Sequence, residues 1–313
     1  MTDFGGSPRP RRGFAMLTVL WVITVGTVVA LAGALMGRNA VNAARNRVQM
    51  ERAFWAAIGC VRRLQATIDE RLQSSLSIDD ASHRWRTLDR EVRRSPLVAD
   101  SGCDYSLEAA GTRIDLNASS DELLGRLLIG LGYGDDAPAM IDALADWRDT
   151  DDLRRPLGVE REWYLATSRM PPRDDTLADI RELARVRGLE DVKGLDSVLS
   201  TEHGRISLAT APATVLMAVP GFTGETAERI VELRDAGTPL RDLIQLPGML
   251  SRASRDELLA HYSEIARITT VDPDAWILTV RAQNGFPPSS VTVEWRMVRT
   301  GRRVAATRMR MLE

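Results

Sequence analysis

Acidic side chains are concentrated in one short stretch near the middle of the chain. Six carboxylates fall between residues 146 and 162, at Asp146, Asp149, Asp151, Asp152, Glu160 and Glu162. Closely spaced carboxylate oxygens in a loop are the hard ligands that Ca²⁺ prefers, although the spacing does not follow the EF-hand pattern. A run of charges is also typical of a solvated surface. The residues alone leave both interpretations open.

Other residue types that could support chemistry are scattered. The histidines His83, His203 and His261 stand singly, and the cysteines do not have the spacing of a zinc site. No Ser/His/Asp or Cys/His constellation indicates catalysis, so we expect a protein that is not an enzyme. The net charge of −2 argues against a strongly basic nucleic-acid-binding protein.

The chain is organised around an uncharged apolar run, residues 14–37, which lies between Arg12 and Arg38. As a helix it would span roughly 36 Å, enough to cross the ~30 Å hydrocarbon core of a bilayer. A buried core helix or a cleaved secretory signal would be the alternatives. The apolar part of a signal is typically 7–15 residues long and ends in a small-residue cleavage site, which is not evident here. We therefore expect a retained transmembrane helix.

The leader arginines predict the orientation of this helix, because basic residues tend to stay in the cytoplasm. Residues after Arg38 would then lie outside, although Arg45 and Arg47 on that side weaken the asymmetry. In an oxidising compartment Cys60 and Cys103 could form a disulfide. Two free buried thiols are the alternative.

The helix is expected to continue far beyond the apolar run. No proline lies between Pro10 and Pro96, so residues 14–73 could form one rod of roughly 90 Å. Apolar side chains recur at three- and four-residue steps along its second half, at Met50, Phe54, Ala57, Val61, Leu64, Ile68 and Leu72. This stripe requires a sheet to cover it.

Period-two alternation predicts strands at both ends of the remaining chain. Cys103, Tyr105 and Leu107 alternate with polar residues, and residues 113–116 could return antiparallel to them. Alternation reappears over residues 276–281 and 291–297, and a Thr300-Gly301 turn leads into residues 303–312. We expect an antiparallel sheet interrupted by helices. The predicted segments are a leader (1–13), a transmembrane helix (14–37), the outer half of the long helix (38–75), an α/β domain (76–116 and 266–313) and a helical insert (117–265).

The insert contains an internal repeat. Residues 113–118 and 205–210 are similar at an offset of 92 residues, and each is followed by helical segments. Residues 219–224 (Val-Pro-Gly-Phe-Thr-Gly) resemble a helix-hairpin-helix turn, whose glycines can face DNA phosphates. That contact needs a basic surface, yet residues 205–260 hold six arginines against seven carboxylates. We therefore expect a structural or protein-binding use and no nucleic-acid binding.

The amino terminus resembles that of type IV prepilins and pseudopilins: a short basic leader ends at Gly13, and the apolar run begins at Phe14. The resemblance implies cleavage after Gly13 by a prepilin peptidase and N-methylation of Phe14. Pilins and major pseudopilins carry Glu at the fifth mature position, where it pairs with a neighbouring subunit; here that position is Thr18. A carboxylate in lipid is costly without such a partner. Its absence suggests a subunit at a filament tip.

The acidic stretch makes the resemblance more specific. Its sequence is similar to the D-W-R-D-x-D and G-A-E…Y patterns of the K-type minor pseudopilins of type II secretion (the GspK family), in Asp146-Trp147-Arg148-Asp149-Thr150-Asp151-Asp152, Gly158-Val159-Glu160 and Trp163-Tyr164. Residues 206–212 match that family's I-N-V-N-T-A-P, except that Ser207 and Ala209 replace both asparagines. The family binds calcium in its helical domain, which implies Asp149, Asp151, Asp152 and Glu160 as ligands.

The resemblance implies an α+β, pilin-like fold: a long amino-terminal helix packed on an antiparallel sheet, with a large all-α insert of helix-hairpin-helix-like repeats. It further implies a minor pseudopilin that caps and initiates the pseudopilus, which drives export of folded proteins across the outer membrane. The expected partners are the I- and J-type minor pseudopilins, the prepilin peptidase and the inner-membrane assembly platform. The chain would cross the inner membrane once, with its carboxy-terminal domain in the periplasm. A membrane-tethered DNA-binding protein of a DNA-uptake system and a type IV pilus minor pilin are the alternatives.

Overall fold

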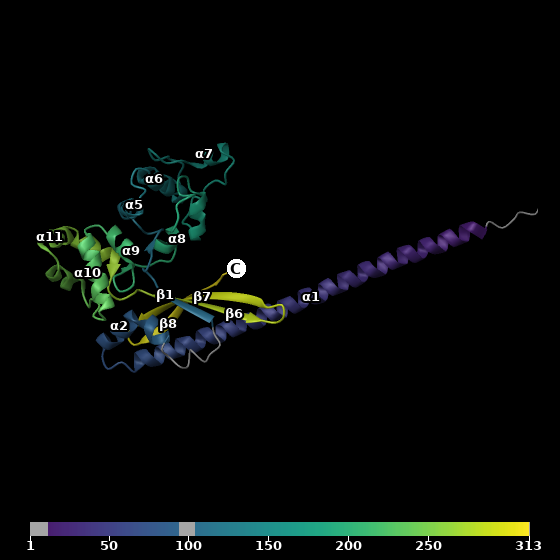
Figure 1. Ribbon diagram of the computed structural model, residues 1–313, viewed down its shortest axis with the longest axis horizontal. Helices are drawn as coiled ribbons and strands as arrows, with labels where there is room; N and C mark the ends of the chain where they lie inside the picture. Colours follow the sequence, from purple (N-terminus) through teal and green to yellow (C-terminus); the bar gives the residue numbers. More distant parts are fainter. Residues whose placement is uncertain (1–11, 94–103, 313) are drawn as a thin grey trace, which may run out of the picture. The chain divides into compact units, whose positions relative to one another are not determined.

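The computed structural model of the protein describes residues 12–93 and 104–312. Its longest element is α1 (Arg12–Gln73), an uninterrupted helix of 62 residues (Figure 1). The hydroxyls of Thr24 and Thr27 donate to the carbonyls of Leu20 and Ile23, four residues earlier. These bonds satisfy the polar side chains within the apolar segment. The predicted continuous helix over residues 14–73 is confirmed.

The chain divides into two compact units, residues 1–56 with 282–291 and residues 57–281 with 292–313. In the first unit, Ser289 Oγ lies 3.4 Å from Gln49 Oε1. Gly285 has φ of +89°, and a Cβ there would lie 2.2 Å from Gln49 Cδ, so glycine is required at this close approach. Among the described residues, α1 is the one helix long and apolar enough to cross a membrane.

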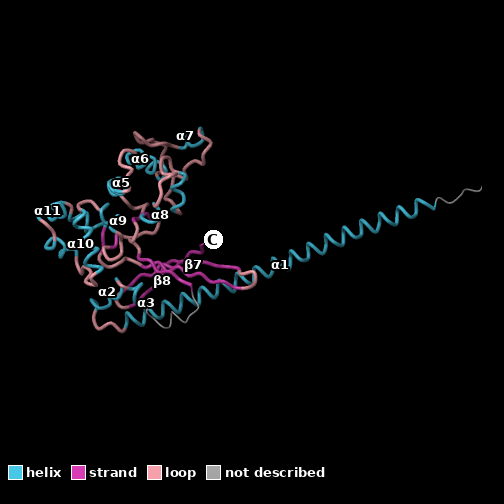
Figure 2. Tube along the Cα trace, viewed as in Figure 1, coloured by secondary structure: helices cyan, strands magenta, loops and turns pink. Residues whose placement is uncertain are grey.

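Four strands form an antiparallel sheet in the order β1-β6-β7-β8. Figure 2 draws the strands in magenta. Their bounds are β1 (Asp104–Ala109), β6 (Trp276–Asn284), β7 (Ser289–Thr300) and β8 (Arg303–Leu312). The register pairs Tyr105 with Val280 and Trp295 with Met309. Val291, Val293 and Met297 are buried, which confirms the predicted alternation in β7. In β6, Val280 is fully buried as predicted, but Ile277, which points to the opposite face, is buried as well.

The charged half of α1 packs on this sheet. Ala57, Val61 and Ile68 are fully buried, whereas Met50, expected on the same stripe, is half-exposed. Polar contacts at the rim fix the register: Asp69 Oδ1 accepts the backbone N–H of Val304 at 2.7 Å, and the Gln65 amide donates to the Val304 carbonyl at 3.4 Å. The sheet therefore provides the cover that the stripe requires.

Two short helices, α2 (Ile78–Arg86) and α3 (Leu88–Arg93), follow α1. Trp85 at the end of α2 is buried against Trp276 of β6, with ring centroids 6.4 Å apart. Both indole N–H groups also donate to backbone carbonyls. The Trp85 indole donates to the Pro273 carbonyl at 2.7 Å, and the Trp276 indole donates to the Trp85 carbonyl at 2.9 Å. These bonds join α2 to the start of β6.

The helical block has its own hydrophobic core, which extends from Ile114 to Ile265. Short elements surround this core: α5 (Asp121–Gly130), α6 (Ala137–Arg148), α7 (Arg161–Ala166), η1 (Ile180–Arg185), α8 (Leu195–Val198), α9 (Ala213–Ala218), α10 (Gly224–Asp235), η2 (Leu243–Met249), α11 (Arg252–Ala260) and α12 (Tyr262–Ile268). The core accounts for the predicted helical insert, and its exact limits at 117 and 265 stay a prediction.

The internal repeat has a structural basis. In the first copy β2 (Ile114–Asp115) pairs in parallel with β3 (Leu199–Ser200), and in the second β4 (Ile206–Ser207) pairs in parallel with β5 (Thr269–Thr270). Two helices follow each strand, α5 and α6 in one copy and α9 and α10 in the other. The expected antiparallel return of residues 113–116 onto the first strand is therefore wrong. These residues turn away from the four-stranded sheet and pair inside the helical block.

Candidate functional site

The acidic stretch begins on α6 and continues into the loop that joins α6 to α7. Helix α6 has proline in its first turn and ends at Arg148, with Asp149 as an extended C-cap residue. Asp142 and Asp146 are one helical turn apart, so both carboxylates lie on the face beside the loop. The helix therefore presents two acidic groups to the loop backbone before the loop's own acids begin.

These two carboxylates hold the loop in place. Asp146 is fully buried, and each of its oxygens lies 3.2 Å from the backbone N–H of Arg155. Asp142 Oδ2 accepts the backbone N–H of Leu157 at 3.0 Å. Gly158 follows at a point where a side chain would overlap the Asp146 carboxylate. The loop N–H groups of Arg155 and Leu157 thus bond to the carboxylates of Asp146 and Asp142 and not to backbone carbonyls.

Aromatic packing fixes the other side of the loop. The ring centroid of Tyr164 lies 5.1 Å from that of Trp147 on α6 and 5.1 Å from that of Trp163. The Tyr164 hydroxyl accepts the backbone N–H of Arg187 at 3.1 Å. Edge-to-face aromatic contacts favour one orientation of the rings. The two ends of the loop, at Asp149 and Glu160, are therefore positioned by buried neighbours.

Carboxylate oxygens without partners lie at these two ends. Glu160 is 8% exposed, and neither of its carboxylate oxygens accepts a hydrogen bond in the described part of the chain. Asp149 Oδ1 is likewise buried and without a hydrogen bond. Buried polar groups in native proteins nearly always have a partner, which includes bound ions. Buried carboxylate oxygens without a hydrogen bond, as at Asp149 and Glu160, are a feature of cation sites.

The electrostatic environment of these groups is strongly acidic. Burial, followed by repulsion from Asp146 and Asp149, raises the pKa of Glu160 to about 7. Burial is also the main cause of the raised pKa of Asp149, with repulsion from Asp151 next. The pKa of Asp146 is raised by burial, against the opposing hydrogen bond from Arg155. A positive charge at this position would relieve all three.

Nearby arginines compensate the acidic cluster only in part. The Arg155 guanidinium is 2.6 Å from a carboxylate oxygen of Asp121, on α5, and 3.8 Å from one of Asp142. Its charge opposes the rise in the pKa of Asp146 and of Asp149. Arg161 lies 3.8 Å from Asp174. In the described part of the chain, neither arginine donates a hydrogen bond to Glu160 or to Asp149 Oδ1.

The predicted ligand set is only partly brought together. Glu160 is buried and Asp149 has one buried carboxylate oxygen, whereas Asp151 and Asp152 are exposed. Asp151 Oδ1 accepts the backbone N–H of Leu153 at 2.8 Å and so caps a turn. Asp152 adds to the field that raises the pKa of Glu160.

Sequence reasoning missed Asp174. This residue has φ of +56°, and its charge raises the pKa of both Asp149 and Glu160. A non-glycine residue with positive φ is uncommon and indicates a turn imposed by its surroundings. Because Asp174 lies outside the acidic stretch, nothing in the sequence indicated that it would join the site.

The donors at the acidic stretch are carboxylate oxygens. Among the described residues, no group of three or more His, Cys, Asp or Glu side chains is placed so that it could by itself hold a metal ion. The buried, unsatisfied oxygens of Asp149 and Glu160 and the surrounding acids are all hard oxygen donors, which suit Ca²⁺ and exclude a soft thiolate or imidazole site. The residues that would hold the ion are Asp149 and Glu160, with Asp152 and Asp174 nearby.

The predicted processing site lies within α1. The backbone of Gly13 and Phe14 is helical and continuous with the apolar segment. Thr18 lies on the exposed surface of the same helix. Cys60 is half-buried on α1, and Cys103 falls outside the described residues, so the Cys60–Cys103 disulfide stays a prediction.

The helix-hairpin-helix-like turn faces the protein. Residues 219–222 are buried, and a Cβ on Gly221 would lie 2.6 Å from His261 Cβ. The Phe222 carbonyl accepts a hydrogen bond from Arg126 on α5 at 3.1 Å. Gly221 and Phe222 thus lie inside the helical block, whereas Gly224, at the start of α10, is exposed.

Comparisons with known proteins agree with the resemblance. Residues 97–193 match the family model "Type II secretion system (T2SS), protein K". The Type II secretion system protein K of Pseudomonas aeruginosa is 25% identical over 247 residues, which cover 72% of this chain and 73% of that protein.

A similar solved structure is the GspK-GspI-GspJ complex from the enterotoxigenic Escherichia coli type 2 secretion system. One chain of it matches with a TM-score of 0.62 at 17% identity, covering 86% of this chain and 99% of that chain. At that identity the likeness establishes the fold, which is α+β and pilin-like. The family model over residues 97–193, the relative and the fold all support the resemblance of this chain to the type II secretion protein K (GspK) family.

Proposed function

We propose that this protein, a minor pseudopilin of type II secretion, caps and initiates the pseudopilus. The observation that carries the tip position is on α1. The helix continues unbroken from the apolar segment to Gln73, and it carries Thr18 at the position where, by the resemblance, pilins and major pseudopilins carry Glu. A subunit without that carboxylate does not need a neighbour to neutralise it in the membrane. The bulky helical block would then lie above the fibre, where no further subunit follows.

The same proposal assigns the partners and the location. I- and J-type minor pseudopilins would pack along α1, because the structural relative is itself part of a complex of GspK with GspI and GspJ. Prepilin peptidase would cut after Gly13 and methylate Phe14, and the assembly platform would then extract the helix from the inner membrane. A single apolar helix at the amino terminus is compatible with one membrane crossing. The role needs no catalysis, so we propose that the protein is not an enzyme.

We further propose that the acidic site binds Ca²⁺ and that the bound ion stabilises the loop between α6 and α7. Bound there, the ion would supply the positive charge that Asp149 and Glu160 lack. Asp142 and Asp146 would keep the loop backbone in place around it, and the packing of Tyr164 would fix the far end. The site would be structural, since no open catalytic group accompanies it.

Genetic complementation tests the role. In a strain lacking its own K-type pseudopilin, expression of this chain together with its native secretion genes should restore appearance of the exoprotein in the medium. Mass spectrometry of the purified protein should show a chain beginning at methylated Phe14. The Gly13→Ala variant is the matched control, because it should be expressed but not cleaved by the prepilin peptidase. Restored secretion by the uncut chain would contradict the processing part of the proposal.

A further inference from the structure

A cavity of ≈ 360 Å³ lies in the second unit, between α2–α3 and the end of the second repeat copy. Its wall is made by side chains of His83, Arg86 and Arg90 on one side. Thr210 and Arg234 contribute the other side, together with the turn at Gly237 that follows α10. The volume is within the range of small-molecule sites. The proposed tip function and the acidic site do not involve this cavity.

Arginine dominates the wall. Arg86, Arg90 and Arg234 line the cavity, whereas Asp89 is the one carboxylate among its lining residues. Guanidinium groups repel one another when brought together, so such a cluster requires anions nearby.

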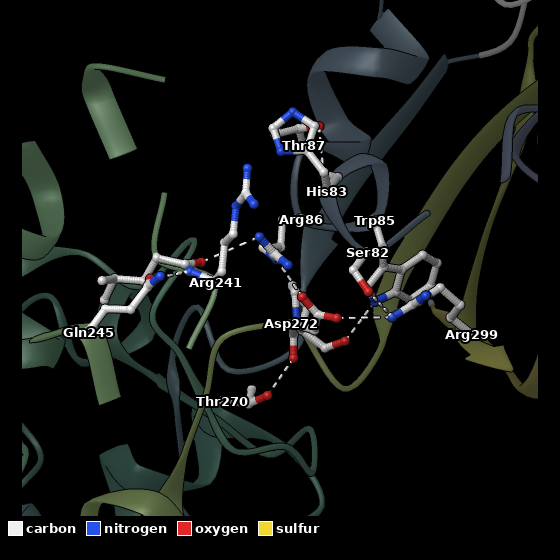
Figure 3. Close-up of polar contacts among 12 residues, drawn as sticks. Ser82, His83, Trp85, Arg86, Thr87, Arg241, Gln245, Thr270, Asp272 and Arg299 are labelled. Carbon is white, nitrogen blue, oxygen red and sulfur yellow. Dashed lines mark hydrogen bonds and ion pairs between the residues drawn. The ribbon is translucent and has the colours of Figure 1, made fainter. Parts of the chain in front are cut away.

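The protein's own carboxylates do not supply enough negative charge for this arginine cluster. Asp272 is shared, since it lies 2.5 Å from Arg86 and 2.9 Å from Arg299 (Figure 3). The carboxylate nearest Arg234 is Asp235, at 4.0 Å and largely exposed. Within residues 12–93 and 104–312, no carboxylate lies within ion-pair distance of Arg90. The three arginines that line the cavity therefore accompany one lining carboxylate, that of Asp89.

Two of the arginines that line the cavity, Arg86 and Arg234, are held by other groups of the protein, whereas Arg90 is exposed. Arg86 has a side chain only 8% exposed and also contacts the Leu240 carbonyl at 3.4 Å. Arg234 donates one N–H to the Ala211 carbonyl at 2.9 Å, which leaves other N–H groups of its guanidinium available. Thr210 Oγ1 accepts from Thr112 at 2.9 Å and keeps its own proton for donation. Fixed donors of this kind, converging on one space, are pre-organised for an acceptor.

We propose that this cavity binds a small multivalent oxyanion of the phosphate class. Arg90 and Arg234 would supply the charge, the Thr210 hydroxyl would donate a further hydrogen bond, and Arg86, fixed by Asp272, would form the base. A planar fork of N–H donors suits phosphate oxygens better than it suits a monovalent halide. The bound anion would join α2–α3 to the end of the second repeat copy.

Titration of inorganic phosphate into the full-length protein in detergent, followed by calorimetry and thermal unfolding, tests the proposal. Chloride at matched ionic strength serves as the reference anion. We expect saturable phosphate binding at one site and a rise in melting temperature that chloride does not give. Absence of saturable binding, or an equal effect of chloride, would overturn the proposal.

Variants assign the binding to the cavity. Arg90→Gln and Arg234→Gln should each weaken phosphate binding by about tenfold or more, because each removes a charge-assisted hydrogen bond. Arg90→Lys should retain part of it. Arg252→Gln, whose side chain is 94% exposed on α11, is the matched control and should bind as the unmodified protein does. Since Arg90 is exposed, Arg90→Gln should fold normally, and unchanged affinity in that variant would contradict the assignment.

Discussion

Gly158 and Asp146 are in such close contact that a Cβ on Gly158 would lie 1.9 Å from Asp146 Oδ2. The glycine allows the buried carboxylate to reach the loop backbone, where it accepts the N–H of Arg155. This relationship holds the acidic loop in one conformation, and with it the positions of Asp149 and Glu160.

Gly158→Ala should therefore destabilise the protein. The added methyl group must displace a buried carboxylate, and overpacking of this kind typically costs about 1–3 kcal/mol. Thermal unfolding should show a clearly lower melting temperature. Gly130→Ala on α5 is the control, because a Cβ there meets nothing within 4 Å, and alanine in a helix is about 1 kcal/mol more favourable than glycine. Equal melting temperatures for the two variants would be inconsistent with the observed contact.

Calcium should stabilise the protein in a pH-dependent way. Since the pKa of Glu160 in the folded chain is raised to about 7, above its value of about 4.3 in an unfolded chain, the folded state binds the proton more tightly. The metal-free protein should thus lose stability as pH rises from about 4.5 to 7. Ca²⁺ competes with that proton, so the rise in melting temperature on adding millimolar Ca²⁺ should be larger at pH 8 than at pH 5.

The Glu160→Gln variant distinguishes the effect of bound Ca²⁺ on stability from the effect of the buried carboxylate charge. In the presence of EDTA at pH 8, this variant should be more stable than the unmodified protein, because the substitution removes an unpaired buried charge. It should also lose most of its response to Ca²⁺. Glu162→Gln, a change in the neighbouring exposed carboxylate, should keep that response. A calcium response that survives Glu160→Gln would show that the ion binds elsewhere.

Asp272→Asn should weaken the junction between α2 and the sheet. The substitution leaves the nearly buried guanidinium of Arg86 without its carboxylate, and Arg299 loses the same partner. Removing a partner from a buried charge costs about 2–4 kcal/mol, measurable by urea unfolding. Asp256→Asn is the control, since Asp256 and Arg252 form an exposed pair at 3.8 Å whose loss should cost less than about 1 kcal/mol. Similar midpoints for both variants would count against a role for Asp272 at this junction.

The Cys60–Cys103 disulfide is a further prediction. Titration of thiols in denaturant should find none before reduction and two after it. Cys60→Ser should then free the second cysteine for labelling without reductant. Equal thiol counts with and without reductant would refute the pair.

The parts of the fold with a repeating pattern could be predicted from the sequence. The stripe of α1 and the alternation in β7 each recur over many residues, so their buried faces followed directly. The pairing of Ile114 with Leu199 could not be predicted, because two-residue strands have no period and their partners lie far apart in the chain.

The candidate site shows the same division. The acids of residues 146–160 were apparent as a cluster, but the sequence did not distinguish the roles of its members. Asp146 is satisfied by backbone N–H groups, whereas Glu160 is buried without a hydrogen bond in the described part of the chain. Asp174 joins the site through a turn with positive φ, which depends on tertiary contacts and not on local sequence.

The central claim is that this chain assembles as the tip subunit with other minor pseudopilins. Its most direct test is co-purification of the full-length, processed chain from detergent-solubilised membranes that also contain the I- and J-type pseudopilins, the major pseudopilin and type IV pilus minor pilins. We expect a stable complex with the I and J types, and we expect Thr18→Glu, but not Thr18→Ser, to reduce its yield by placing an unpaired carboxylate in the membrane. Recovery with the pilus proteins instead, or of this chain alone, would contradict the claim.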